Sequence, residues 1–200
     1  MNEAEWLTCS NPLPMLEFLS GKVSARKLRL FAVAAYRRIR HWVVDPDGRR
    51  AIEVAERFAD QQASQGELAE AWAAAHRYYL NSYKDTLHAY AASDADAAHA
   101  AHIAVLDVEA VERIDGLADL LREIAGNPFR AIGVEPIWLT RPVTLIAQAS
   151  YERQEFDRLP ILADALEDAG CDNAEVLSHL RGPGPHVRGC WALEKLLLKS

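Results

Sequence analysis

The sequence predicts an all-α protein, an irregular bundle of antiparallel helical hairpins with a C-terminal cluster of short helices. Three observations support this prediction. Apolar side chains recur at steps of three and four, clusters of Pro and Gly separate the periodic segments, and no segment alternates with the two-residue period of a strand. Half of the 200 residues are apolar, which is enough for one sizeable core or two small cores in contact.

The first hairpin is predicted near the N-terminus. Ser24 is a plausible N-cap for a helix whose apolar residues follow at helical spacing. The turn residues of 45–48 then break this helix, and an amphipathic helix follows them. The residues predicted to face inward on the first helix are Leu28, Phe31, Ala35, Ile39 and Trp42.

The middle of the chain is rich in Ala and other strong helix formers. A long helix is expected from Ser64 to about Ala92. The acidic stretch 93–96 is suited to cap a further helix through His102, and the amphipathic pattern repeats over 106–125. Gly126 and the Asn-Pro pair that follows it are expected to end this last helix.

Residues 127–141 lack helical periodicity and mark a soft boundary, which divides the chain into a 1–126 bundle and a 127–200 subdomain. Four short helices are expected beyond it, with Pro142 and Pro160 in first-turn positions. The apolar residues of the irregular stretch are expected to pack down, namely Phe129, Ile132, Ile137 and Trp138.

The charge distribution argues against a general polyanion binder, because the formal net charge is -7. Residues 1–50 nevertheless hold nine basic and five acidic side chains, whereas residues 51–125 hold five and fourteen. The basic helix is a weak candidate for nucleic-acid or anion binding, and pairing with the acidic segment is the favoured alternative. Its cations are Arg26, Lys27, Arg29, Arg37, Arg38 and Arg40.

The N-terminus and the cysteines indicate the compartment. Glu3 and Glu5 stand where a secretory signal carries positive charge, and no long apolar run follows. Cys9, Cys171 and Cys190 are too few for a disulfide scaffold. We therefore expect a cytoplasmic protein with free thiols and no membrane span.

Two groups of residues are candidate metal ligands. Asp96, His99 and His102 share a helix face at three-residue spacing, although ligands from a facing helix are missing. The second group has the donor types of a structural zinc site but not the usual two-to-four residue spacing. It consists of Cys171, His179, His186 and Cys190.

The same C-terminal segment permits two other interpretations. Arg181, His186 and Arg188 are a weak candidate for an anion pocket. Alternatively, the stretch GPGPHVRGC is a rigid corner, with His186 and Arg188 tied to acidic residues of the helix over 161–168. Cys190 lacks an identifiable orienting partner for nucleophilic catalysis, so no catalytic residue is assigned.

Several segments resemble a paralogue-rich family of bacterial proteins found in large genomes. They are EAEWL, PMLEFLSGK, SARKLRLFAVAAYRRI, GNPFR and LPILADALEDAGCDNAEVLSHLRGPGPHVRGCW. The resemblance implies a helical, cytoplasmic, adaptor-like module and assigns no activity, cofactor or catalytic residue. The segment LADALEDAG is also similar to an element of short helical companion domains of repeat and signalling proteins.

The leading functional prediction is a non-enzymatic helical module that binds a protein partner, because no assembled catalytic constellation is evident. The first alternative is a metal-binding helical bundle, structural or catalytic, that uses one of the two ligand groups. The third is nucleic-acid or anion binding through the helix over 26–40.

Overall fold

A computed structural model describes residues 1–81, 88–111 and 116–199. In these residues all regular structure is helical and no strand occurs, which confirms the all-α prediction. None of the described helices combines the length and the apolar character that a membrane span needs. The chain divides into two compact units, Met1–Leu121 and Arg122–Ser200.

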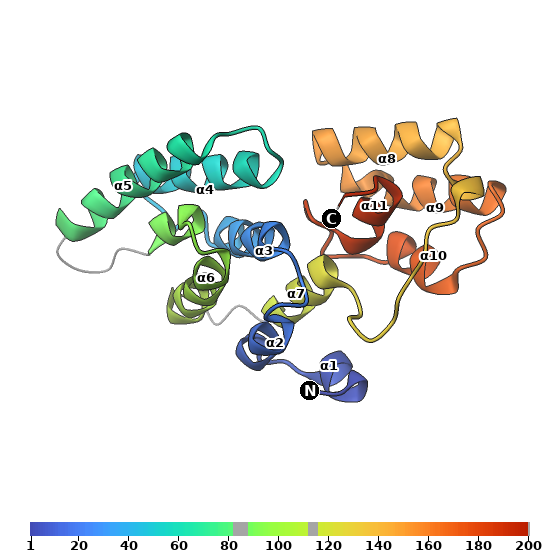
Figure 1. The fold of residues 1–200 in the computed structure, drawn as a ribbon, viewed down its shortest axis with the longest axis horizontal. Coiled ribbons are helices and arrows are strands. Elements are labelled where there is room, and N and C mark those ends of the chain that lie inside the picture. Colours follow the sequence, from blue (N-terminus) through green and yellow to red (C-terminus); the bar gives the residue numbers. More distant parts are fainter. Residues whose placement is uncertain (82–87, 112–115, 200) are drawn as a thin grey trace. The chain divides into compact units, whose positions relative to one another are not determined.

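The first unit is built around α3, which packs against α4 and α6, while α4 also packs against α5 (Figure 1). The short 3-10 helix η1 contacts α4, α5 and α6. The elements are α1 (Glu3–Thr8), α2 (Pro12–Leu19), α3 (Ala25–Arg38), α4 (Pro46–Ala59), α5 (Gln65–Asn81), η1 (Ala89–Ser93) and α6 (Ala97–Val111).

Helix α3 forms as the sequence predicts. The hydroxyl oxygen of Ser24 accepts the backbone N–H of Lys27, so Ser24 is the N-cap. Phe31 and Ile39 are fully buried. The prediction that Trp42 faces inward is wrong, because α3 ends at Arg38 and the helical register does not extend to this side chain, which is 48% exposed.

The long helix predicted from residue 64 to about residue 92 is shorter in the structure. The described part of α5 runs to Asn81, and residues 89–93 form η1 rather than an α-helix. Residues 82–87 of the predicted helix lie outside the described residues. The stretch 93–96 caps the next helix as expected, because the Asp96 carboxylate accepts the first backbone N–H groups of α6.

Tertiary hydrogen bonds explain why the backbone near η1 leaves the α-helical path. The buried guanidinium of Arg29 on α3 donates to three backbone carbonyls in η1 and directly after it, those of Ala92, Asp94 and Ala95. The carboxylate of Asp107 on α6 accepts the backbone N–H of His88 at 2.7 Å and its ring Nδ1 at 2.6 Å. These groups satisfy backbone donors and acceptors that a continuous helix would satisfy internally.

Helix α7 (Leu117–Ala125) carries the division between the two units. The predicted helix over 106–125 therefore appears as the end of α6 and as α7, and residues 112–115 between them are outside the described part. Gly126 ends α7 with a φ of +70°, a conformation that favours glycine, as the sequence predicts.

The second unit contains the four predicted short helices, with Pro142 and Pro160 in their first turns as predicted (Figure 1). Helix α9 packs against α8 and α10, and α11 packs against the same two helices. The elements after α7 are η2 (Pro136–Trp138), α8 (Arg141–Arg153), η3 (Phe156–Arg158), α9 (Leu159–Asp168), α10 (Ala174–Arg181) and α11 (Trp191–Leu196).

The irregular stretch 127–141 packs down only in part. Trp138 is buried in the core of the second unit, and Ile132 packs against that core. Ile137 and Phe129 were predicted to pack as well, but they are 70% and 40% exposed. The prediction is wrong for Ile137 because η2 turns Trp138 inward and its neighbour Ile137 outward. It is wrong for Phe129, which lies in a separate turn where the Asn127 side chain accepts its backbone N–H.

Candidate metal centre

Four polar side chains of the second unit meet in one place. They are Glu123 near the end of α7, His179 in the last turn of α10, His186 in the following loop and Cys190 at the start of α11. One ligand atom from each lies within 4.8 Å of all the others. In the part of the chain that the structure describes, this is the one group of three or more such side chains that is close enough to share a metal ion.

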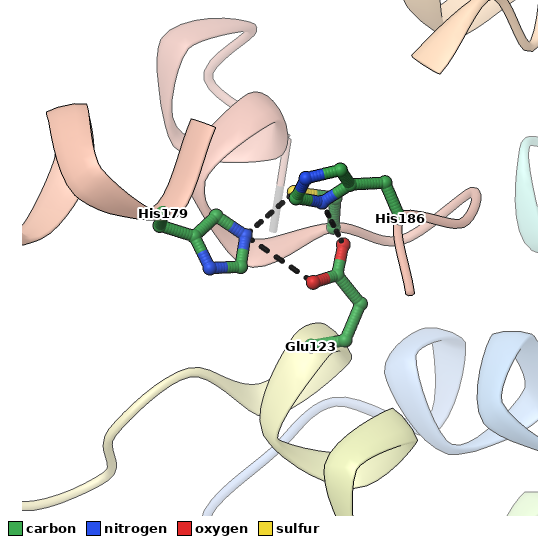
Figure 2. Close-up of side chains that lie close together, drawn as sticks. Glu123, His179 and His186 are labelled. Atoms are coloured by element: carbon green, nitrogen blue, oxygen red, sulfur yellow. Dashed lines mark hydrogen bonds and ion pairs between the residues drawn. The ribbon is translucent and has the colours of Figure 1, made fainter. Parts of the chain in front are cut away.

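The Glu123 carboxylate lies between the two imidazoles (Figure 2). Its Oε1 is 3.2 Å from Nδ1 of His186, and its Oε2 is 3.2 Å from Nε2 of His179. The same Nε2 lies 3.3 Å from Sγ of Cys190. A carboxylate oxygen, two ring nitrogens and a sulfur therefore face a common centre.

The group is largely shielded from solvent. Glu123 is 4% exposed and Cys190 is fully buried, while the side chains of His186 and His179 are 8% and 20% exposed. The second ring nitrogen of His186, Nε2, lies 3.1 Å from the backbone carbonyl of Gly182. A carbonyl in this position fixes the orientation of an imidazole, as in many metal sites.

The ring of His179 is oriented by Trp191, whose indole N–H donates to Nδ1 at 3.2 Å. An indole N–H can only donate, so Nδ1 of His179 is the acceptor and the ring proton lies on Nε2. In the absence of a metal, that proton points toward the carboxylate of Glu123. A metal bound at Nε2 has to replace it.

Burial and the neighbouring histidines shift the pKa of the Glu123 carboxylate in opposite directions. Burial on its own raises the pKa of Glu123, but hydrogen bonds from His179 and His186 outweigh burial and hold the pKa below its ordinary value. For His186, burial lowers the pKa, and the bond to Glu123 reverses the effect and raises it. Both directions favour a carboxylate anion beside a protonated His186 in the metal-free protein.

The thiol of Cys190 is protonated in this environment. Burial, followed by the negative charge of Glu123, raises its pKa well above the ordinary value. A divalent cation at the centre reverses this electrostatic balance, because a coordinating thiol loses its proton to the metal. Without a metal, Cys190 is therefore a poor nucleophile.

Local sequence explains how the loop reaches this centre. The Gly-Pro repeat over 182–185 cannot continue α10, since proline lacks a backbone donor, so the chain turns before His186. Gly126 allows a close approach on the other side. A Cβ added to it would lie 3.1 Å from the Trp191 ring, which bonds to His179.

Three of the six separations between the ligand atoms are close to those of a tetrahedral zinc site. Metal–ligand distances for zinc give N···O edges of about 3.3 Å and N···S edges of about 3.6 Å in a regular tetrahedron. The two N···O separations of 3.2 Å and the N···S separation of 3.3 Å are within a few tenths of these values. The other three separations reach up to 4.8 Å, so these ligand atoms would have to move closer together around an ion.

Three of the four zinc ligands proposed from the sequence are in this group, and Glu123 takes the fourth position. Cys171 is buried in the core of the second unit and is not part of the group. Sequence reasoning missed Glu123, although a signal was present. Glu123 follows Leu120 by three positions and therefore falls on the apolar stripe of α7, where a carboxylate needs a partner.

The second candidate, Asp96, His99 and His102, does not form such a group among the described residues. The Asp96 carboxylate caps α6, and the His99 ring lies 2.9 Å from a carboxylate oxygen of Asp94. His102 is exposed. Asp96 therefore has the capping role that was predicted for its segment.

The three residues of the weak anion-pocket candidate have separate partners. Arg181 forms ion pairs with Asp164 and Glu167 of α9, and His186 contacts Glu123. Arg188 donates to the backbone carbonyls of Tyr151 and Glu152. The corner is thus tied to the acidic helix by Arg181, whereas the sequence analysis assigned this role to His186 and Arg188.

Much of the basic helix is used inside the first unit. Arg26 pairs with Asp60 at 2.8 Å, Arg37 pairs with Glu56 at 2.7 Å, and Arg29 binds backbone carbonyls. Arg38 is half-buried, which lowers its pKa, and Asp119 opposes the shift. Lys27 is partly buried and Arg40 is exposed.

No family model, curated protein or solved structure matches this chain. The resemblance to a paralogue-rich bacterial family stays a prediction.

Proposed function

We propose that the unit Arg122–Ser200 is a zinc-binding module with a structural metal ion held by Glu123, His179, His186 and Cys190. The observation that carries the proposal is the convergence of four ligand atoms, from four separate segments, within 4.8 Å of one another.

The donor set favours zinc over other common metals. Imidazole and thiolate ligands suit zinc, whereas magnesium and calcium prefer oxygen ligands throughout. Four protein ligands complete a tetrahedral shell and leave no position for water or substrate. This supports a structural ion over a catalytic one.

The metal would connect α7, α10, the loop after it and α11. A unit of this size has a small core, so a metal cross-link contributes folding free energy that the apolar residues alone supply only marginally. The protein-interaction role predicted from the sequence stays a prediction, and a zinc-stabilised scaffold is compatible with it.

The metal content of the purified, tag-free protein tests the proposal. We expect zinc at about one equivalent per chain, and its loss in the Cys190→Ser and Glu123→Gln variants. Cys171→Ser is the matched control, since Cys171 is equally buried in the same core but lies outside the ligand group. Zinc that is lost in Cys171→Ser and retained in Glu123→Gln would favour the ligand set proposed from the sequence and contradict this one.

Cobalt(II) provides a second readout that does not depend on stability. Tetrahedral cobalt with a thiolate ligand absorbs in the visible and has a sulfur-to-metal charge-transfer band in the near ultraviolet. The wild type and Cys171→Ser are expected to show both features, and Cys190→Ser is expected to lose the charge-transfer band. Wild-type protein that stays colourless with cobalt and contains no zinc would refute the proposal. The four side chains would then be held together by hydrogen bonds alone.

A further inference from the structure

The first unit contains a basic cavity that the zinc site does not involve. It has a volume of about 430 Å³ and is lined by Arg37, Arg40, Val43, Arg49, Ile52 and Glu53. These residues come from the end of α3, the turn after it and the first half of α4. Three guanidinium groups face one carboxylate, so the lining is net positive in a chain whose net charge is -7.

The three arginines differ in how they are held. Arg37 is fixed at the wall by its ion pair with Glu56. Arg49 donates from Nε to the backbone carbonyl of Val43 at 2.6 Å, which orients the guanidinium and directs its terminal nitrogens away from that bond. Arg40 is exposed and has no carboxylate partner among the residues that the structure describes.

Helix stability does not explain this arrangement. A cation in the last turn of a helix, such as Arg37 in α3, is favoured by the helix dipole. Arg49 is in the first turn of α4, where the dipole disfavours positive charge. An anionic ligand bound bidentately by guanidinium groups offsets this cost.

An aromatic surface adjoins the cavity. Val43 also lines a second, shallow pocket together with Trp42, Tyr78, Tyr79 and Tyr90. At about 30 Å³ this pocket has room for little more than a water molecule, so a planar group would lie across it. Trp42 and Tyr78 are 48% and 39% exposed, and the Trp42 ring makes a tilted contact with the ring of His41.

We infer that this surface binds a nucleotide, with its phosphates at Arg40 and Arg49 and its base stacked on Trp42. Guanidinium groups recognise phosphate oxygens, and an exposed aromatic ring beside them adds base stacking. Glu53 is the one acidic group lining the cavity. It limits the phosphate charge that the cavity accommodates and offers an acceptor for ribose hydroxyls.

Titration of the zinc-loaded protein with ATP, followed by calorimetry, tests the inference. Arg49→Gln and Arg40→Gln are expected to weaken ATP binding about tenfold or more, as expected for lost bonds to a charged group. Arg50→Gln is the matched control, because Arg50 is the neighbour of Arg49 on α4 and does not line the cavity. Arg40→Gln keeps the test informative if Arg49→Gln melts at a lower temperature, since Arg40 has no side-chain partner in the described structure.

Two further measurements test the aromatic contact and the source of the nucleotide. Trp42→Leu is expected to weaken the binding of ATP and to leave the binding of inorganic pyrophosphate unchanged, because pyrophosphate has no base. A single-stranded DNA oligomer that binds more tightly than ATP, and is weakened by Arg49→Gln and Trp42→Leu, identifies the nucleotide as part of a strand. Absence of ATP binding, an equal effect of Arg50→Gln, or pyrophosphate as tight as ATP would overturn the inference.

Discussion

At the scale of single residues, the role of a side chain in the candidate metal site depends more on its contact partners than on its residue type. His179 and His186 were candidate ligands from the sequence, but their roles depend on Glu123, a residue with no distinguishing motif. Trp191 adds a constraint on the protonation of His179, because its indole N–H donates a hydrogen bond to Nδ1. A metal at Nε2 then requires the ring proton to move to Nδ1, and two N–H groups cannot share one hydrogen bond.

Zinc binding is therefore expected to break the bond between Trp191 and His179. In a proton–nitrogen correlation spectrum, the indole signal of Trp191 is expected to shift upfield when zinc is added to the metal-free protein. The signal is assigned by its absence in Trp191→Phe, and the indole of Trp6, a residue buried in the first unit, is the internal control. An unchanged Trp191 signal at full zinc occupancy would show that Nε2 of His179 is not a ligand.

At the scale of elements, the ends of the helices decided where the site formed. The loop of 182–185 carries His186 back toward α7, and α11 begins at Cys190. Gly126 has two reasons to be glycine. Its φ is positive, and any side chain there would press on the ring of Trp191.

Gly126→Ala is expected to destabilise the second unit by about 1–2 kcal/mol, because an L-residue in the left-handed conformation is strained by that amount. The contact with Trp191 adds to the effect. Thermal denaturation is expected to show a melting temperature lowered by several degrees. Gly133→Ala is the control, since a Cβ there meets nothing within 4 Å and the backbone is not left-handed. Equal stability of the two variants would contradict this account of Gly126.

At the scale of the whole molecule, the chain is two compact units with separate candidate sites. All four proposed zinc ligands belong to Arg122–Ser200, and the arginine cavity belongs to Met1–Leu121. A ligand that binds only the folded state stabilises the cooperative unit that contains its site. Each ligand is therefore expected to stabilise only the unit that contains its site.

Hydrogen exchange with and without a chelator is expected to separate the units. Removal of zinc should increase amide exchange in α7, α10 and α11, by an amount that corresponds to about 2.7 kcal/mol at a metal concentration 100 times the dissociation constant. Exchange in α3 and α4 serves as the reference. A larger loss of protection from exchange in α3 than in α10 would mean that the metal stabilises the first unit, which contradicts the proposed site.

The sequence by itself determined the fold class, the caps and most helix boundaries. Ser24 as a cap, Gly126 as a stop, and the four short helices after residue 141 depend on backbone bonds and side-chain periodicity over a few residues, so a local pattern predicts them. Three of four members of the candidate site lie within twelve residues, and their donor chemistry was also visible in the sequence.

The tertiary structure decided what depends on distant parts of the chain. The 3-10 conformation of residues 89–93, the exposed position of Trp42 and the selection of Glu123 over Cys171 depend on parts of the chain that are far apart in sequence. Arg29 illustrates the physical reason, because its bonds to carbonyls more than sixty residues away override the strong local helix propensity near residue 92. Propensity is worth tenths of a kilocalorie per residue, whereas a buried charged hydrogen bond is worth several times more.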